Sequence, residues 1–172
     1  MAAALAFDTT SRDATEALGE ALAPQLRAGD VLILSGDLGA GKTQLTKGIA
    51  RGLGVAEPVT SPTFNLLLVH EGRVPLYHFD LYRLEFAEQL EDLDYWGTLE
   101  ADGVSVVEWG DRFPDSMPAD GLTVTILITD DDARTLVLEP LGERGASLAT
   151  AWIAAAANVP GSRVLGDAEA SS

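Results

Sequence analysis

Apolar residues along this chain follow two different periods. The continuous apolar runs at 31–35 and 104–107 are typical of strands that are buried in a parallel sheet. In residues 14–22, apolar residues instead recur every three or four positions, which predicts a helix that Pro24 cuts short. Residues 44–53 also have a helical pattern. Strands and helices therefore alternate, as in an α/β protein.

Two further pairs of apolar segments are joined by short polar turns. The segments 64–69 and 74–80 flank the turn Glu71-Gly72-Arg73. The segments 122–129 and 134–139 flank three consecutive aspartates. Both pairs predict β-hairpins, because strand-like runs separated by a few turn residues pair with each other.

The remaining segments complete the predicted architecture. Residues 5–8 predict a short edge strand, 84–99 a strongly acidic helix and 145–157 an alanine-rich helix. No internal repeat and no second domain is visible, so we expect one domain over residues 1–157. Residues 158–172 are small and polar, and we expect them to form a disordered C-terminal tail.

Composition narrows the possible functions. The 172 residues include 27 acidic and 11 basic side chains, which gives a formal net charge of −16. Such a surface repels nucleic acids on average, so we expect no autonomous binding of DNA or RNA. The absence of cysteine excludes disulfides and thiol catalysis. No apolar stretch is long enough for a membrane helix, and Met1–Leu5 lacks a signal-peptide pattern, so we expect a cytoplasmic protein.

The strongest motif is Gly36-Asp37-Leu38-Gly39-Ala40-Gly41-Lys42-Thr43, which reads G-x-x-x-x-G-K-T. It lies between a buried strand and a helix, the context in which this pattern forms a phosphate-binding P-loop. Backbone N–H groups, a helix N-terminus and Lys42 would contact the phosphates of a nucleotide, and Thr43 would ligate Mg²⁺. The chain has only one other lysine, Lys47. The motif predicts a P-loop NTPase-like domain whose mostly parallel central sheet is flanked by helices and carries antiparallel hairpins.

Acidic residues end two of the predicted strands. Asp80 ends the strand at 75–80 in the manner of a Walker-B acid, whose carboxylate helps to hold Mg²⁺. Glu108 ends the strand at 104–107, at the sheet edge where ligands bind in open α/β folds. Either carboxylate could orient an attacking water. The neighbouring Trp109 could stack on a base, close the site or fill the core.

Four motifs in this order and spacing resemble the TsaE (YjeE) family of small bacterial P-loop ATPases. They are GDLGAGKT at 36–43, TSPTF at 60–64, YHFDLYRL at 77–84 and VEW at 107–109. The resemblance covers about residues 11–139. It implies an ATP-binding and ATP-hydrolysing protein that acts on the TsaD–TsaB complex. That complex makes threonylcarbamoyladenosine at adenosine 37 of tRNAs that read ANN codons, and TsaD carries out the transfer.

The resemblance also implies site residues. Lys42, Asp80 and Glu108 would be catalytic, and Thr43 and Glu108 would ligate Mg²⁺ with support from Asp80. Gln44 stands where the family often has a second threonine, but no proposed ligand is altered. The implied ATP-binding residues are Ser11, Gly36, Asp37, Leu38, Gly39, Ala40, Gly41, Lys42, Thr43, Gln44, Thr63, Trp109 and Arg134.

Other P-loop functions stay open at this point. A small-molecule kinase is the main alternative, although the nine arginines are scattered and no short segment resembles an arginine-bearing lid. A GTPase ranks last because the guanine-reading N-K-x-D string is absent. A nucleotide-gated adaptor, in which binding matters more than turnover, is the non-enzymatic alternative.

Overall fold

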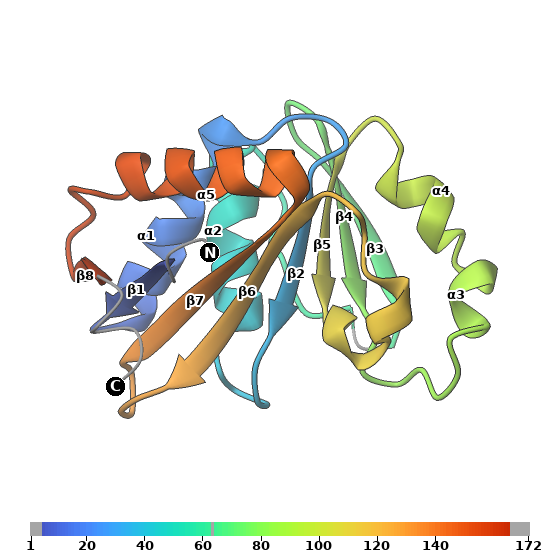
Figure 1. The fold of residues 1–172 in the computed structure, drawn as a ribbon, viewed down its shortest axis with the longest axis horizontal. Helices are drawn as coiled ribbons and strands as arrows, with labels where there is room; N and C mark the ends of the chain where they lie inside the picture. Colours follow the sequence, from blue (N-terminus) through green and yellow to red (C-terminus); the bar gives the residue numbers. More distant parts are fainter. Residues whose placement is uncertain (1–4, 63, 166–172) are drawn as a thin grey trace.

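A single mixed sheet forms the centre of the molecule (Figure 1). The structure, a computed structural model, describes residues 5–62 and 64–165. Within them the strand order is β3-β4-β5-β2-β6-β7-β1-β8. The strands are β1 (Leu5–Thr9), β2 (Val31–Ser35), β3 (Leu67–Glu71), β4 (Pro75–Asp80), β5 (Val104–Glu108), β6 (Gly121–Ile128), β7 (Arg134–Leu141) and β8 (Ser162–Leu165).

The middle of this sheet is parallel. Strands β4, β5, β2 and β6 run in the same direction, whereas β3, β7, β1 and β8 join by antiparallel pairing. The hairpins β3–β4 and β6–β7 are the two predicted from the sequence. The predicted α/β domain with a parallel centre and antiparallel hairpins is therefore confirmed. The carboxyl ends of the four parallel strands meet at one edge of the sheet, the lower edge in Figure 1.

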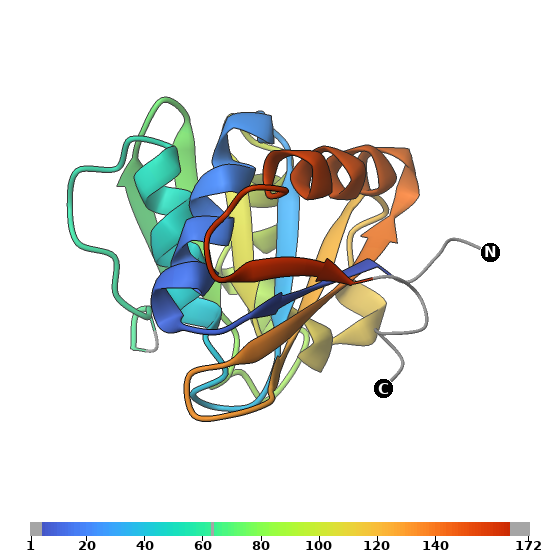
Figure 2. The same ribbon diagram turned by 90° about the vertical axis from the view of Figure 1, so that its left-hand side faces the viewer.

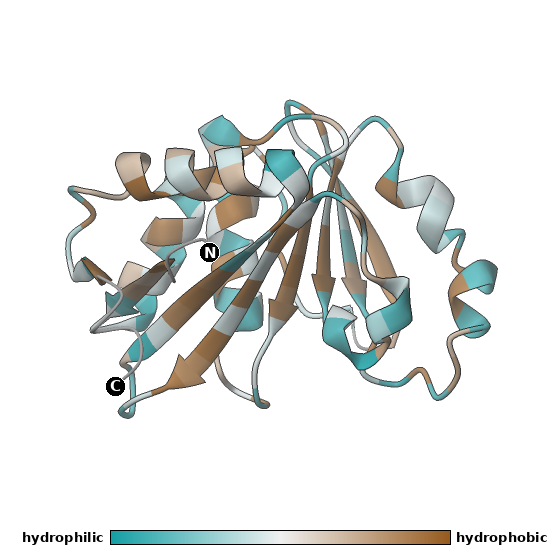
Figure 3. Ribbon diagram, in the orientation of Figure 1, coloured by the Kyte–Doolittle hydropathy of each residue, from teal (hydrophilic) through white to brown (hydrophobic). Residues whose placement is uncertain are grey.

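Helices cover both faces of the sheet. On one face α1 (Arg12–Leu22), α2 (Lys42–Gly52) and α5 (Gly142–Ala155) bury a core that includes Leu34 and Trp152 (Figure 2). On the other face α3 (Gln89–Asp92), α4 (Tyr95–Leu99) and two 3₁₀ helices, Gly110–Arg112 and Pro114–Ser116, cover a smaller core around Phe79. In Figure 3 much of the central strands is brown, the colour of hydrophobic residues, as expected of strands that are covered on both faces. No helix in the described ranges is long and apolar enough to cross a membrane.

Helices α1 and α2 touch backbone to backbone. A Cβ on Gly48 would lie 1.8 Å from the carbonyl oxygen of Glu16, and one on Gly19 would lie 2.4 Å from that of Leu45. Real Cβ atoms do not approach backbone atoms so closely, so glycine is required at both contacts. This contact fixes α2, and with it the P-loop, against α1.

Two predicted segments differ from the structure. The expected helix at 84–99 is two short helices, because Asp94 between them has φ 50°, a left-handed conformation that interrupts an α-helix. The expected disorder from residue 158 is wrong for residues 162–165. These residues form β8, which follows a turn at Gly161 and pairs with β1, so β1 is an inner strand. Residues 166–172 lie outside the described part of the chain.

Candidate nucleotide site

The predicted site residues converge at the carboxyl edge of the parallel strands. In the sheet register Glu108 pairs with Asp80 on one side and with Leu34 on the other. The loop from Gly36 to Gly41 leaves the end of β2 at this edge and leads into α2. Together these segments enclose a pocket of about 370 Å³, a size in the usual range for small-molecule sites.

Glycine is required at both ends of the loop. Gly36 has φ 143°, and a Cβ there would lie 2.6 Å from the carbonyl oxygen of Ile126. Gly41 has φ 115° and is the N-cap of α2, where no side chain caps the helix. The first N–H groups of a helix have no intrahelical partner. Those of α2, at the pocket wall, are therefore available to an anion.

Lys42 is folded back on the loop. Its Nζ donates to the carbonyl oxygens of Gly36 at 2.6 Å and Asp37 at 2.9 Å, and it lies 4.2 Å from the centre of the Trp109 ring. Burial lowers the pKa of Lys42, an effect opposed by the nearby carboxylates of Glu108 and Asp80. Phosphate oxygens entering the pocket would compete with the two carbonyls for this ammonium group.

A chain of hydrogen bonds joins α2 to β4 through Glu108. The Thr43 hydroxyl donates to Glu108 Oε1 at 3.1 Å, and His78 Nε2 lies 2.6 Å from Glu108 Oε2. Because a carboxylate only accepts, Nε2 carries the proton of the second bond. His78 is 0% exposed and Glu108 is 3% exposed, so solvent cannot replace either partner. His78 therefore fixes the orientation of the Glu108 carboxylate.

Asp80 holds the segment that follows α2. Its Oδ2 accepts from the Ser61 hydroxyl at 3.0 Å, and its Oδ1 accepts from the backbone N–H of Tyr82 at 3.0 Å. The rings of Tyr82 and Trp109 pack with centroids 5.0 Å apart at the same pocket. The loop that carries Ser61 is thus tied to one of the two candidate metal-binding acids.

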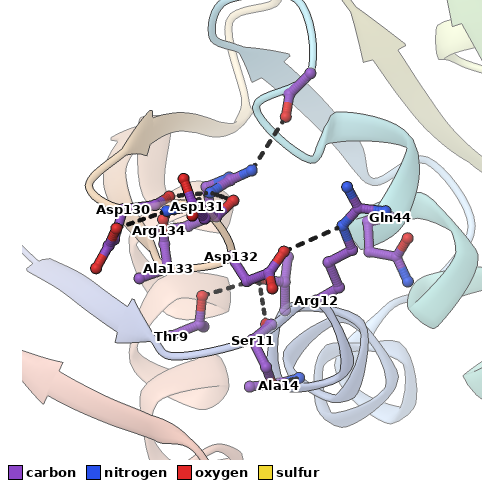
Figure 4. Close-up of polar contacts among 12 residues, drawn as sticks. Thr9, Ser11, Arg12, Ala14, Gln44, Asp130, Asp131, Asp132, Ala133 and Arg134 are labelled. Carbon is purple, nitrogen blue, oxygen red and sulfur yellow. Dashed lines mark hydrogen bonds and ion pairs between the residues drawn. The ribbon is translucent and has the colours of Figure 1, made fainter.

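Arg134 connects the P-loop to the turn between β6 and β7 (Figure 4). Its Nε donates to Ala40 O at 2.7 Å and its Nη2 to Gly39 O at 3.3 Å. The guanidinium also binds carbonyl oxygens of the β6–β7 turn. These belong to Asp130, Asp131 and Ala133. Arg134 lines the pocket, as expected of a nucleotide-contacting residue, but its donors are used to hold backbone.

The adenine-side prediction for Ser11 is not matched by the pocket. The Ser11 hydroxyl accepts from Ala14 N–H at 3.1 Å and so caps α1, and Ser11 is absent from the pocket lining (Figure 4). Its neighbour Arg12 lines the pocket instead, with Nε 3.6 Å from Asp132 Oδ1 across the mouth. The resemblance thus placed the start of α1 at the site, and in the structure Arg12, not the helix-capping Ser11, lines the pocket.

The site residues fall into three groups: predicted residues that do not line the pocket, pocket residues that were not predicted, and predicted residues that line it. Gly36 and Asp37 belong to the loop but line a neighbouring groove, and Thr63 lies outside the described residues. Sequence reasoning missed Arg12, Thr15, Ser61, Tyr82, Asp132 and the buried His78. Predicted residues that line the pocket are Leu38, Gly39, Ala40, Gly41, Lys42, Thr43, Gln44, Asp80, Glu108, Trp109 and Arg134.

Part of what was missed had a signal in the sequence. His78 lies two positions before Asp80 on β4, so a period of two places both side chains on the same face. Ser61 and Tyr82 are members of the quoted motifs. Arg12, Thr15 and Asp132 carry no motif, since tertiary packing alone brings α1 and the β6–β7 turn to the pocket.

Comparison with known proteins gives consistent matches. A family model described as "Threonylcarbamoyl adenosine biosynthesis protein TsaE" matches residues 9–136. The chain is 39% identical over 141 residues to the tRNA threonylcarbamoyladenosine biosynthesis protein TsaE of Bacillus subtilis (strain 168), covering 81% of this chain and 88% of the relative. It is 46% identical over 138 residues to the protein of the same name from Streptomyces coelicolor, covering 76% and 93%.

A solved structure agrees with these sequence relatives. The crystal structure of Bacillus subtilis YdiB superposes with a TM-score of 0.74 at 33% sequence identity. The match covers 88% of this chain and 95% of YdiB. The likeness therefore extends over most of both chains.

Proposed function

Because this chain belongs to the TsaE family, we propose that it binds and hydrolyses ATP with Mg²⁺ in tRNA threonylcarbamoyladenosine biosynthesis. In this proposal it acts on the TsaD–TsaB complex, which modifies adenosine 37 of ANN-decoding tRNAs. The name shared by its relatives supports the pathway. The residues that line the pocket support the proposed binding and hydrolysis of ATP.

The observation that carries the ATPase proposal is the meeting of four side chains at one sheet edge. Lys42, Thr43, Asp80 and Glu108 come from α2, β4 and β5 and line a single pocket beside uncapped N–H groups of α2. In such an arrangement the loop N–H groups bind phosphate oxygens and Lys42 exchanges its carbonyl partners for them. Trp109 and Tyr82, whose rings pack together, form one wall of the pocket.

The oxygen donors present fit Mg²⁺. The Thr43 hydroxyl lies 3.1 Å from a Glu108 carboxylate oxygen, and the Asp80 carboxylate lines the same pocket, so hard oxygen ligands are concentrated there. No group of three or more His, Asp or Glu side chains in the described residues could hold a metal alone. This is usual for Mg²⁺, which takes one or two carboxylates together with substrate phosphates and water. When bound, the ion would neutralise charge on the phosphate oxygens.

Hydrolysis also needs an oriented water molecule. Asp80 and Glu108 are the two buried carboxylates in the pocket, and either could accept a hydrogen bond from the attacking water. The net charge of −16 is compatible with a protein that acts on a tRNA-modifying complex without binding tRNA by itself.

The test uses the full chain with ATP and Mg²⁺, alone and with purified TsaD and TsaB. We expect slow hydrolysis alone, faster hydrolysis with the pair, and co-elution with it. Lys42→Ala should abolish ATP binding, whereas Lys47→Ala, a change to the exposed second lysine, should leave it intact. Unchanged ATP affinity in Lys42→Ala would refute the site, and failure to bind the pair in every nucleotide state would refute the partner assignment.

A further inference from the structure

A second and larger cavity, the groove that Gly36 and Asp37 line, lies on the other side of the P-loop. It measures about 720 Å³ and lies between β6 and the two 3₁₀ helices that follow β5. In β6 the side chains of Leu122, Val124 and Ile126 face the core under α1, α2 and α5. The alternate side chains, Thr123, Thr125 and Leu127, therefore face this groove. Figure 1 shows that no helix from the described part of the chain covers this side of β6 and β7.

Hydroxyl groups form the floor of the groove. Ser35, at the end of β2, pairs in register with Thr125 of β6, and both line the groove together with Thr123. Ser35 is 5% exposed, yet its Oγ has no hydrogen-bond partner among the described residues. Buried side-chain hydroxyls in proteins are nearly always partnered. The Ser35 hydroxyl is therefore available to a polar group that enters the groove.

Acidic and apolar side chains line the sides. The carboxylates of Asp37, Asp111 and Glu139 line the groove, and none forms an ion pair within the described part of the chain. Among residues 5–62 and 64–165, no arginine or lysine lines it. Met117 and the 48%-exposed Leu127 provide apolar surface. This lining is complementary to a cationic group attached to an apolar one.

We propose that this groove is a docking site for a partner-protein segment that presents an arginine next to an apolar side chain. The planar guanidinium can bind carboxylates through two parallel hydrogen bonds and still donate to hydroxyls, which suits this floor and these sides. A second copy of this chain is a poor occupant because each copy carries a charge of −16. The C-terminal residues after Leu165 are also unsuited, since they contain two acids and no cation.

The groove and the nucleotide pocket share a wall. Trp109 lines both, and Asp37 lines the groove while its backbone carbonyl accepts from Lys42 Nζ. A ligand that draws Lys42 away from the Gly36 and Asp37 carbonyls would change the groove side of the loop. Docking and nucleotide binding are therefore coupled, and each should change the affinity of the other by the same factor. This coupling, unlike the docking itself, rests on the proposed function.

The docking is tested with acetyl-Leu-Arg-Leu-amide and the full-length protein, followed by backbone amide chemical shifts. A peptide with citrulline in place of arginine has nearly the same shape without the charge. We expect shifts centred on Thr123, Thr125 and Leu127, with weaker binding of the citrulline peptide. Glu139→Gln should weaken binding of the arginine peptide about two- to fivefold, the usual loss for one exposed charge pair. Glu143→Gln, an exposed acid outside the groove, is the matched control and should have no effect.

Three results would overturn the docking: equal binding of both peptides, shifts located elsewhere, or equal loss in both glutamate variants. The coupling is tested separately by repeating the titration with saturating Mg-ATP. An unchanged peptide affinity while Mg-ATP is bound would overturn the coupling. If Mg-ATP itself does not bind, the proposed function fails, and the peptide titration without nucleotide still decides the docking.

Discussion

Replacing His78 tests whether the hydrogen-bond chain through Glu108 organises the proposed Mg²⁺ site. His78→Ala removes the donor that holds Glu108 Oε2 at 2.6 Å, in a place with no solvent to replace it. Leaving a buried charged acceptor without its partner costs about 1–3 kcal/mol or more. Mutation of a residue that hydrogen-bonds to a metal ligand and orients it typically lowers metal affinity about 10- to 100-fold. We therefore expect the Mg²⁺ concentration for half-maximal ATP binding to rise by about that factor.

The assay is a Mg²⁺ titration of ATP binding, accompanied by urea unfolding of each variant. His78→Gln offers an N–H donor at a similar distance along the side chain and should restore most of the Mg²⁺ affinity. His70 is a matched control, because it is the only other histidine, is also buried and also contacts a glutamate, Glu57 at 2.5 Å. His70→Ala should lower stability without shifting the Mg²⁺ titration.

The reasoning would be refuted if His78→Ala kept the wild-type Mg²⁺ titration while folding normally. It would also be refuted if His70→Ala shifted the titration as much as His78→Ala, since the effect would then reflect general loss of stability. A Gln variant no better than the Ala variant would show that the hydrogen bond itself does not position Glu108.

Three further predictions follow from buried contacts. Arg134→Lys removes the guanidinium group that donates to five carbonyl oxygens. We expect the free energy of unfolding in urea to fall by about 1–3 kcal/mol and ATP binding to weaken. Unchanged values of both would show that Arg134 does not hold the P-loop in place. Gly36→Ala places a Cβ 2.6 Å from a backbone oxygen and should abolish ATP binding in an equilibrium titration. Burial raises the pKa of Tyr95 to about 12. Above pH 10 the unfolded state loses this proton more readily than the folded state, so the free energy of unfolding should fall by about 2 kcal/mol between pH 10 and 12, and Tyr95→Phe should remove most of that fall in urea titrations.

Local sequence signals predicted the parts of this site that local geometry determines. The P-loop and the acids Asp80 and Glu108 were found because strand ends and glycine spacing are short-range features. Arg134 was placed at the pocket by resemblance, but its role as a brace depends on the β6–β7 turn lying against the loop. That contact joins residues 94 positions apart, and no pattern along the chain reports it.

The errors have physical causes of the same kind. The strand at 162–165 was predicted as disorder because most of the stretch 158–172 is small and polar, while the strand is stabilised by hydrogen bonds to β1. The residues at 84–99 follow a helical pattern, but Asp94 adopts a left-handed conformation that this pattern does not reveal. The first prediction used composition and the second used the helical pattern, whereas the structure is determined by strand pairing in one case and by one backbone angle in the other.

The close contact between α1 and α2 has a consequence for the entropy of ligand binding. Because Gly48 and Gly19 bring the two backbones together, no layer of side chains separates α1 from α2 at these contacts, and none there can rearrange when the first turn of α2 is occupied. The N–H groups that face an incoming anion are therefore already fixed in direction, and little backbone freedom is lost on binding. The freedom that is lost belongs mainly to the Lys42 side chain, which changes partners. An anion could then enter and leave this site by a change of the Lys42 rotamer, while the backbone of α2 keeps its position.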